Sequence, residues 1–271
     1  MNAPQLQTHK RRDGKAPLVM LTAYDEPTAR LADAASVDLL LVGDSVANVV
    51  LGHADTLHVS VEVMAHHVAA VAAARPSAMI VADMPWLSYH GTTADAVANA
   101  GVLIRAGSQA VKIEGGRNRL AVVRALVDAE IPVIGHLGLT PQSVLALGGF
   151  RVQAKTVDAA ERLLEDALAL EAAGISALVL EAVPANVGAA VTDALTIATI
   201  GIGAGADTDG QVLVFHDILG LTATAPAKFV RQYADVGRII TSAISSYAAD
   251  VRNGSFPGAS ETYAPTSDPA H

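Results

Sequence analysis

Five apolar segments of this chain end abruptly in an ionisable residue. An unpaired charge is costly to bury away from water, so a buried strand does not normally contain one. The five segments are 39–45 (LLLVGDS), 79–85 (MIVADMP), 110–116 (AVKIEGG), 132–138 (PVIGHLG) and 177–183 (ALVLEAV). Charges at the same C-terminal end of several runs predict parallel strands that direct polar groups toward one shared site. Enzymes built on a (β/α)8 barrel are organised in this way.

Apolar runs alternate with helical patterns along the chain, and eight runs are candidate strands. The strands are expected at 18–23, 39–43, 78–82, 110–114, 132–136, 177–181, 198–203 and 212–216. Helices are expected at 26–35, 60–74, 93–106, 118–129, 157–173 and 186–194, with Asp25 and Ser60 as N-caps. Strands that are apolar on both faces and separated by helices are typical of a parallel sheet covered on both sides. We therefore predict a (β/α)8 TIM barrel. An open doubly wound sheet is the alternative, because the last strand is short and no helix precedes it.

The domain organisation expected from this pattern is a single barrel domain with two flanking segments. Residues 1–16 form a polar N-terminal segment, and 17–252 form the barrel with one or two closing helices within 229–252. Residues 253–271 are rich in Gly, Ser, Pro and Thr, which predicts a flexible C-terminal tail.

Composition argues against several classes of protein. The chain has no cysteine, which excludes disulfides and thiolate metal sites. Its net charge is −9 and only 4% of residues are aromatic, so we expect no nucleic-acid partner. No apolar run approaches the roughly 18 residues of a membrane span, and the N-terminal residues lack the apolar core of a secretory signal. We expect a cytoplasmic protein with no membrane partner.

Asp44 and Asp83 each end a strand and precede a turn signal. Two carboxylates from different strands, with only oxygen ligands in reach, suit a hard cation such as Mg²⁺. The alternative is that each aspartate is an N-cap or a turn former.

Lys112 and Glu114 lie two residues apart in one strand, so their side chains point to the same face. The helix-covered face is apolar, which favours the barrel interior, beside the expected cation. The chain has only five lysines, so one inside a strand is notable. A structural Lys–Glu ion pair that plugs the barrel is the alternative.

Three further features of the strand ends could take part in chemistry. Glu181 ends a strand among apolar residues, where a carboxylate suits the work of a general base, although a structural role before Pro184 is an equal alternative. His136 could bind a substrate oxygen or relay a proton, but a lone histidine there is more often a core residue. GIGAG (201–205) lacks the GxGxxG spacing, so we interpret it as a tight turn with close backbone approach.

A cation held by carboxylates, with a lysine and a basic glutamate nearby, suits a 2-oxo acid substrate. The acid's carboxylate and keto oxygen can chelate the metal, which stabilises the enolate formed when a base removes the C3 proton. The residues alone do not name the electrophile that would react with this enolate.

Several motifs closely resemble the ketopantoate hydroxymethyltransferase family, across about residues 17–256. They are VGDS (42–45), ADMP (82–85), VKIEGG (111–116), GHLGLTPQSV (135–144), ALALEAAG (167–174), LVLEAVP (178–184) and GIGAG with the following TDGQVLVFHD (201–217). The resemblance implies a (β/α)8 barrel, a homodecamer, 3-methyl-2-oxobutanoate as substrate, 5,10-methylenetetrahydrofolate as one-carbon donor, and the first committed step of pantothenate synthesis.

The resemblance also implies a role for individual residues. Mg²⁺ would be bound by Asp44, Asp83 and Glu114, the last through water. Substrate contacts would come from Asp44, Ser45, Asp83 and Lys112, and Glu181 would be the proton acceptor. Two alternatives stand beside this assignment. One is an enzyme of the phosphoenolpyruvate mutase and isocitrate lyase group, which the lack of a catalytic cysteine disfavours; the other is a non-catalytic barrel, which predicts loss of strand-end acids.

Overall fold

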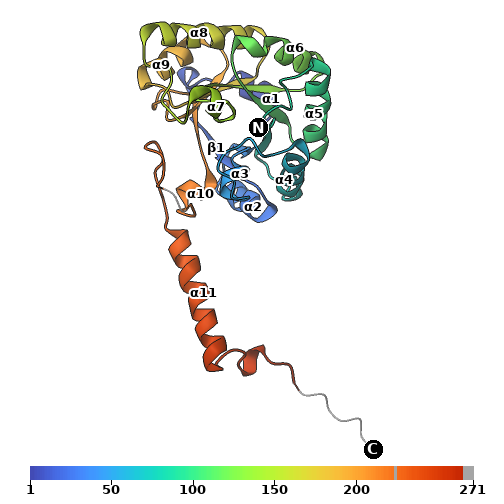
Figure 1. Ribbon diagram of the computed structural model, residues 1–271, viewed down its shortest axis with the longest axis vertical. Coiled ribbons are helices and arrows are strands. Elements are labelled where there is room, and N and C mark those ends of the chain that lie inside the picture. The colour runs from blue at the N-terminus through green and yellow to red at the C-terminus, as the bar shows by residue number, and fades with distance from the viewer. Residues whose placement is uncertain (223–224, 265–271) are drawn as a thin grey trace, which may run out of the picture. The chain divides into compact units, whose positions relative to one another are not determined.

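The computed structural model describes residues 1–222 and 225–264 of the 271-residue chain (Figure 1). The chain divides into two compact units. The barrel unit comprises residues 1–215 and 227–230, and the C-terminal unit comprises the described residues of 216–226 and 231–271.

Eight parallel strands close into a barrel in the sequential order β1 to β8. The strands are β1 (Leu18–Thr22), β2 (Leu39–Val42), β3 (Met79–Asp83), β4 (Ala110–Glu114), β5 (Val133–Gly138), β6 (Ala177–Glu181), β7 (Ala198–Ile202) and β8 (Gly210–Leu213). The predicted (β/α)8 barrel is confirmed. Pairing of β1 with β8 excludes the open doubly wound sheet, and β8 begins two residues earlier than predicted.

Helices surround the strands, as the sequence predicts (Figure 1). They are α2 (Glu26–Ala34), α4 (Val61–Ala73), α5 (Thr93–Ala106), α6 (Leu120–Asp128), α8 (Val157–Ala172) and α9 (Ala185–Ala194). The predicted N-caps are correct, since the Asp25 side chain accepts a hydrogen bond from the Thr28 amide and Ser60 accepts one from the Val63 amide. No helix lies between β7 and β8, and α10 (Phe215–Ile218) follows β8 in the chain.

Four short α-helices among the described residues have no counterpart in the prediction: α1 (Ala3–Gln7), α3 (Val46–Val49), α7 (Val144–Leu147) and α10, which takes up the last two residues of the strand predicted at 212–216. The first lies in the predicted polar N-terminal segment. A capping box between Asn2 and Gln5 opens it, and its Leu6 is fully buried. Leu6 joins the apolar cluster inside the barrel, together with Leu18 and Met20 near the starts of strands. The N-terminal segment therefore covers the N-terminal end of the barrel.

A buried ion pair holds the N-terminal segment against the barrel. Lys10 Nζ lies 2.6 Å from Asp209 Oδ2 and also donates to the backbone carbonyls of Thr192 and Ile197. Asp209 in turn accepts hydrogen bonds from the Arg11 amide at 2.9 Å and the Thr199 amide at 2.9 Å. Both charged side chains are nearly fully buried. Each is satisfied by the other, as buried charges must be.

Two apolar cores flank the strands. The larger core lies between strands and helices, and the smaller one fills the barrel interior. The interior core contains alternate strand residues, such as Met79 and Val81 of β3 or Ala177 and Val179 of β6. Side chains on a strand alternate between faces, so the interior face can be followed along each strand to its C-terminal end.

The C-terminal unit contains one long helix, α11 (Val236–Asn253), where one or two helices within 229–252 were predicted. Residues 229–235 are not helical, and α11 has no buried residue. A short 3-10 turn (Ala259–Glu261) lies within the predicted tail, whose last residues, 265–271, lie outside the described part of the chain. Among the described residues, no helix has both the length and the apolarity to cross a membrane.

Candidate active site

Strand alternation carries five polar residues into the C-terminal end of the barrel. Each is an even number of positions beyond an apolar residue of the interior core, so it points to the same face. Asp83 follows Val81, Lys112 and Glu114 follow Ala110, His136 follows Ile134, and Glu181 follows Val179. The interior position expected for the Lys112–Glu114 pair is therefore correct.

Asp44 and Asp83 lie next to each other, as the sequence predicts. The Asp44 amide donates to Asp83 Oδ2 at 3.0 Å. Lys112 Nζ lies 3.0 Å from Asp83 Oδ1 and 3.7 Å from Glu114 Oε1. All four side chains are buried. Residues separated by up to 70 positions along the chain thus form one charged cluster.

Burial and mutual repulsion shape the charge of this cluster. Burial raises the pKa of Asp44 well above its usual range, and the neighbouring charges of Asp83 and Glu114 raise it further. Burial also raises the pKa of Asp83, although Lys112 opposes the shift. Burial lowers the pKa of Lys112, but the surrounding carboxylates outweigh it and raise that pKa overall. The lysine is therefore cationic, and Asp44 is the carboxylate whose charged form its burial and its acidic neighbours disfavour most.

His136 links this cluster to Glu181. Its Nδ1 lies 3.3 Å from Glu114 Oε1 and 3.2 Å from Lys112 Nζ, and its Nε2 lies 3.3 Å from Glu181 Oε2. Burial and the charge of Lys112 lower the pKa of His136, but its hydrogen bonds with the two glutamates outweigh them and raise it to about 9. The imidazole is then protonated at neutral pH and stabilises both carboxylates.

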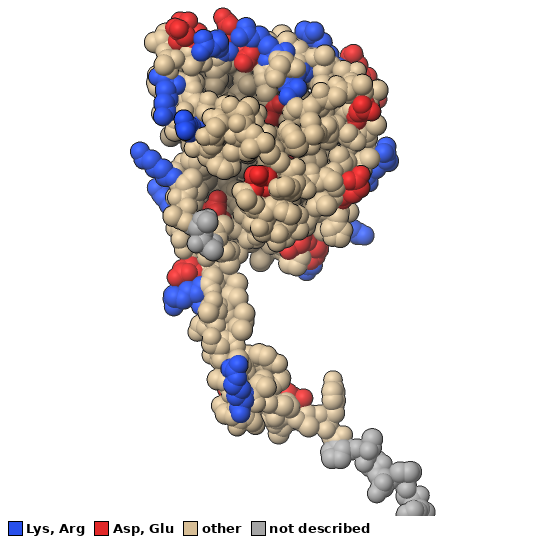
Figure 2. Space-filling view, in the orientation of Figure 1, with Lys and Arg blue, Asp and Glu red and all other residues tan. Residues whose placement is uncertain are grey.

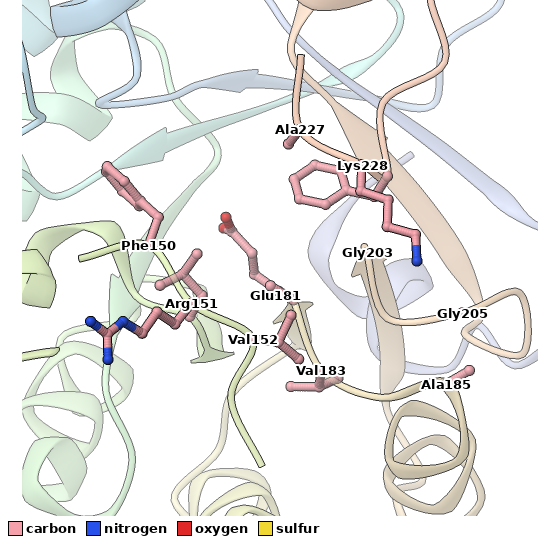
Figure 3. Close-up of a pocket in the computed structure, with 13 residues that line it drawn as sticks. Phe150, Arg151, Val152, Glu181, Val183, Ala185, Gly203, Gly205, Ala227 and Lys228 are labelled. Atoms are coloured by element: carbon pink, nitrogen blue, oxygen red, sulfur yellow. The ribbon is translucent and has the colours of Figure 1, made fainter. Parts of the chain in front are cut away.

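Among the acidic residues predicted for the site, Glu181 is the one whose side chain faces open space. Its side chain is 15% exposed, against 3% for Glu114. It lines a cavity of about 710 Å³ and points into it, as Figure 3 shows. Acidic atoms are also visible inside hollows of the barrel face in Figure 2. The arrangement is a carboxylate at the base of an open cavity, with a charged cluster buried behind it.

Gln142 is a central residue of the site that the sequence analysis did not identify. Its Nε2 donates to Asp44 Oδ2 at 2.8 Å and to the Met84 carbonyl at 2.9 Å. Its Oε1 accepts from the Tyr89 hydroxyl at 2.6 Å, and its backbone amide donates to Glu114 Oε2 at 3.0 Å. One buried residue therefore orients two of the predicted metal ligands. The signal available for it was its place in the GHLGLTPQSV motif (135–144), in the 3-10 helix Pro141–Ser143 that follows β5.

Ser45 and the GIGAG turn complete the predicted features. Ser45 Oγ lies 2.8 Å from the Tyr24 hydroxyl, beside Asp44. Burial raises the pKa of Tyr24, so its hydroxyl stays protonated and can hydrogen bond. In the turn, Gly203 has φ +67°, and a Cβ there would lie 2.7 Å from the Phe229 ring. The close approach expected for this turn is present.

The donor set of the cluster fits a hard divalent cation, although it does not form a ready coordination shell. Within residues 1–222 and 225–264, no three histidine or acidic side chains are grouped so that they could hold a metal ion. Lys112 and the Asp44 amide contact the two carboxylate oxygens of Asp83, and Gln142 donates to Oδ2 of Asp44. The oxygens are nevertheless of the type that Mg²⁺ prefers, and a cation would relieve the repulsion among Asp44, Asp83 and Glu114 that raises the pKa of Asp44.

Solved structures with similar folds belong to enzymes of diverse chemistry. Phosphonopyruvate hydrolase in complex with oxalate and Mg²⁺ has a TM-score of 0.62 at 13% identity, covering 96% of this chain and 93% of that one. Phosphoenolpyruvate phosphomutase from Streptomyces platensis subsp. rosaceus has a TM-score of 0.61 at 17% identity, covering 98% and 92%. Identities this low show a shared fold alone.

Sequence similarity is far more specific. A protein named 3-methyl-2-oxobutanoate hydroxymethyltransferase 2 from Bradyrhizobium diazoefficiens is 56% identical over 96% of this chain and 88% of its own length. The 3-methyl-2-oxobutanoate hydroxymethyltransferase of Moorella thermoacetica is 52% identical over 94% of both chains. The sequence profile of ketopantoate hydroxymethyltransferases matches residues 1–259. The chain is therefore a transferase that belongs to the ketopantoate hydroxymethyltransferase family.

Proposed function

We propose that this protein transfers a hydroxymethyl group from 5,10-methylenetetrahydrofolate to 3-methyl-2-oxobutanoate, giving 2-dehydropantoate for pantothenate biosynthesis. Family membership supports the reaction class. The observation that carries the proposal is the position of Glu181, which contacts buried His136 and opens on the cavity. A carboxylate that contacts the charged cluster and also faces open space can act as a base on a substrate bound beside it.

The buried cluster would bind the oxo acid end of the substrate. Asp44 and Asp83 are the residues that would hold Mg²⁺, with Glu114 acting through water because His136 and the Gln142 amide engage its oxygens. The bound cation would supply a Lewis acid for the oxo acid's carboxylate and keto oxygens, which stabilises negative charge on the substrate. The Lys112 ammonium would bind a substrate oxygen from the same side.

Glu181 would remove the proton at C3 of the oxo acid. His136 Nε2 lies 3.3 Å from Glu181 Oε2, so the imidazole can orient that carboxylate toward the substrate. The C3 carbanion then forms a new bond to the one-carbon unit, and both C–N bonds that hold this unit to the folate break. Water supplies the hydroxyl group, and the two nitrogens of the leaving tetrahydrofolate take up the proton held by Glu181 and one proton of the water. Glu114, on the other imidazole nitrogen, holds the ring in place.

Solvent exchange at C3 tests the role of Glu181 without the folate. NMR in D2O should show Mg²⁺-dependent loss of the C3 proton signal of 3-methyl-2-oxobutanoate, and Glu181→Gln should abolish it. The matched control is Glu165→Gln, which removes a surface acid on α8 that pairs with Arg117. Wild-type exchange rates in Glu181→Gln would show that another group is the base.

Product formation tests the whole reaction. Protein supplied with Mg²⁺, the oxo acid and the folate should form 2-dehydropantoate. If none is formed while proton exchange proceeds normally, the proposed donor is wrong. If neither reaction occurs in the intact protein, the proposed function is wrong.

We also propose that the chain assembles as a homo-oligomer, as the expected homodecamer requires. Support comes from α11, where Ile240, Ile244, Tyr247 and Val251 recur at helical spacing and are 44–60% exposed. An exposed apolar stripe of this kind marks a contact surface. Sedimentation velocity should show dissociation in Ile240→Glu/Ile244→Glu but not in Ser242→Glu, on the opposite helix face. An unchanged sedimentation coefficient in the double variant would contradict this assignment.

A further inference from the structure

The cavity beside Glu181 is larger than the oxo acid alone requires. Its volume of about 710 Å³ falls within the range of about 300–1,000 Å³ that holds ligands of drug size. A five-carbon oxo acid needs a small part of that space, and the charged cluster that would bind it is buried behind Glu181. The remaining volume therefore suits a second and larger reactant.

The cavity walls are mostly apolar and carry two aromatic rings. Leu139, Val152 and Val183 line it, together with Phe150 and Phe229. Phe150 is 60% exposed, which leaves its ring face free for a partner. Aromatic side chains stack on flat ring systems with favourable energy. The wall chemistry thus suits a planar, largely uncharged ring system close to the carboxylate of Glu181.

Two cations lie at the rim of the same cavity. Apart from Glu181, the charged residues of its lining are Arg151 and Lys228. They come from different parts of the chain and lie on opposite sides of the cavity in Figure 3. Both are exposed, and neither forms an ion pair with any described residue. Unpaired positive charges around an apolar cavity suit a ligand with an anionic end.

We infer that this cavity is the binding site of the one-carbon donor, with its ring system against Phe150 and its carboxylate tail at Arg151 and Lys228. The inference rests on the proposed function and assigns to it a binding site for the donor. A planar heterocycle with a carboxylate tail matches the cavity in size, apolarity and charge. The tail binds at the rim, and the ring end carries the one-carbon unit toward Glu181.

Donor kinetics with and without the tail test this assignment. Exposed ion pairs are individually weak, so Arg151→Gln/Lys228→Gln should raise the KM for the folate donor about fivefold. With a methylene-tetrahydropterin that lacks the glutamate tail, the double variant and wild type should have the same KM. Phe150→Ala should raise the KM for both donors. Arg124→Gln, which removes an exposed arginine of α6, is the matched control.

Proton exchange at C3 separates this inference from the proposed function, because exchange needs no donor. It reports whether the oxo acid site is intact in each variant. An unchanged donor KM in the double variant, with normal exchange, would overturn the assignment of Arg151 and Lys228. An equal rise in KM for the tail-less donor would also overturn it. Absence of exchange in the wild type would instead refute the proposed function.

Discussion

Replacing Gln142 with methionine isolates the role of its side-chain amide. Methionine has a similar length but cannot reproduce the amide's hydrogen bonds. The substitution removes the donations to Asp44 Oδ2 at 2.8 Å and to the Met84 carbonyl at 2.9 Å, and the bond from Tyr89 at 2.6 Å. The backbone bond to Glu114 is retained. The variant therefore tests how far the side chain organises Asp44.

The magnitude follows from the two acceptors that lose their donor, Asp44 Oδ2 and the Met84 carbonyl, since the Tyr89 hydroxyl keeps its contacts with the Glu114 backbone. Each group left without a partner costs about 1–3 kcal/mol, so the free energy of unfolding should fall by about 2–6 kcal/mol if little relaxation occurs. Burial and the charges of Asp83 and Glu114 raise the pKa of Asp44, and the bond from Gln142 opposes them. Its loss should therefore favour protonated Asp44. Losing a group that orients a metal ligand costs about 10–100-fold in metal affinity.

Calorimetric titration with Mg²⁺ and urea unfolding measure these two effects. Gln211→Met is the control, because Gln211 also makes two side-chain donations, to the Gly205 carbonyl and to Thr208 Oγ1, outside the charged cluster. The control should lose stability without losing Mg²⁺ affinity. A folded Gln142→Met protein whose Mg²⁺ affinity stays within about twofold of wild type would refute the reasoning.

Three other predictions concern the two ends of the barrel. Asp209→Asn leaves the Lys10 ammonium, 2% exposed, without a charge partner, and should lower the free energy of unfolding by about 3–5 kcal/mol, measured with urea; a loss below about 1 kcal/mol would contradict this. Burial raises the pKa of Asp209, but Lys10 and the backbone amides outweigh it and lower that pKa. The wild-type advantage over Asp209→Asn should therefore be constant above pH about 5 and disappear only as pH falls below about 4, in unfolding midpoints measured across pH. Gly138→Ala should lower the free energy of unfolding by about 2–5 kcal/mol and slow C3 exchange, because Gly138 has φ +92° and a Cβ there would lie 2.2 Å from the Glu181 carbonyl. The control is Gly14→Ala, at φ +80° with no atom within 4 Å of the added Cβ, which should lower the free energy of unfolding by only about 1–2 kcal/mol in thermal unfolding.

Much of the fold could be predicted because its signals are local. Apolar runs placed all eight strands to within about two residues at most ends, and single residues such as Asp25 and Ser60 marked where helices begin. The C-terminal region was predicted less well. Residues 229–235 have a composition compatible with a helix but do not form one. Local preference is a weak guide where few tertiary contacts support it.

The candidate site could be predicted as far as strand alternation reaches. Because side chains alternate between the two faces of a strand, Lys112 and Glu114 lie on one face. The acidic residues that end the apolar runs indicate which end of the barrel holds the site. Gln142 escaped detection because it lies in a three-residue 3-10 helix (Pro141–Ser143), which is too short for a periodic pattern to indicate which way a side chain points. Its partners Asp44 and Tyr89 are 98 and 53 residues away in the chain.

The sequence by itself determined the order of the elements and the end of the barrel that carries the charged side chains. Burying a charge is costly, so charges at the same end of several apolar strands indicate a site there. Tertiary structure alone decided which distant groups meet. Lys10 lies in the predicted polar N-terminal segment, yet it pairs with Asp209, 199 positions away, and helps to hold that segment over the end of the barrel. Closure of eight strands also places His136 between Glu114 and Glu181. Such contacts depend on the geometry of the closed barrel, which no local pattern of residues records.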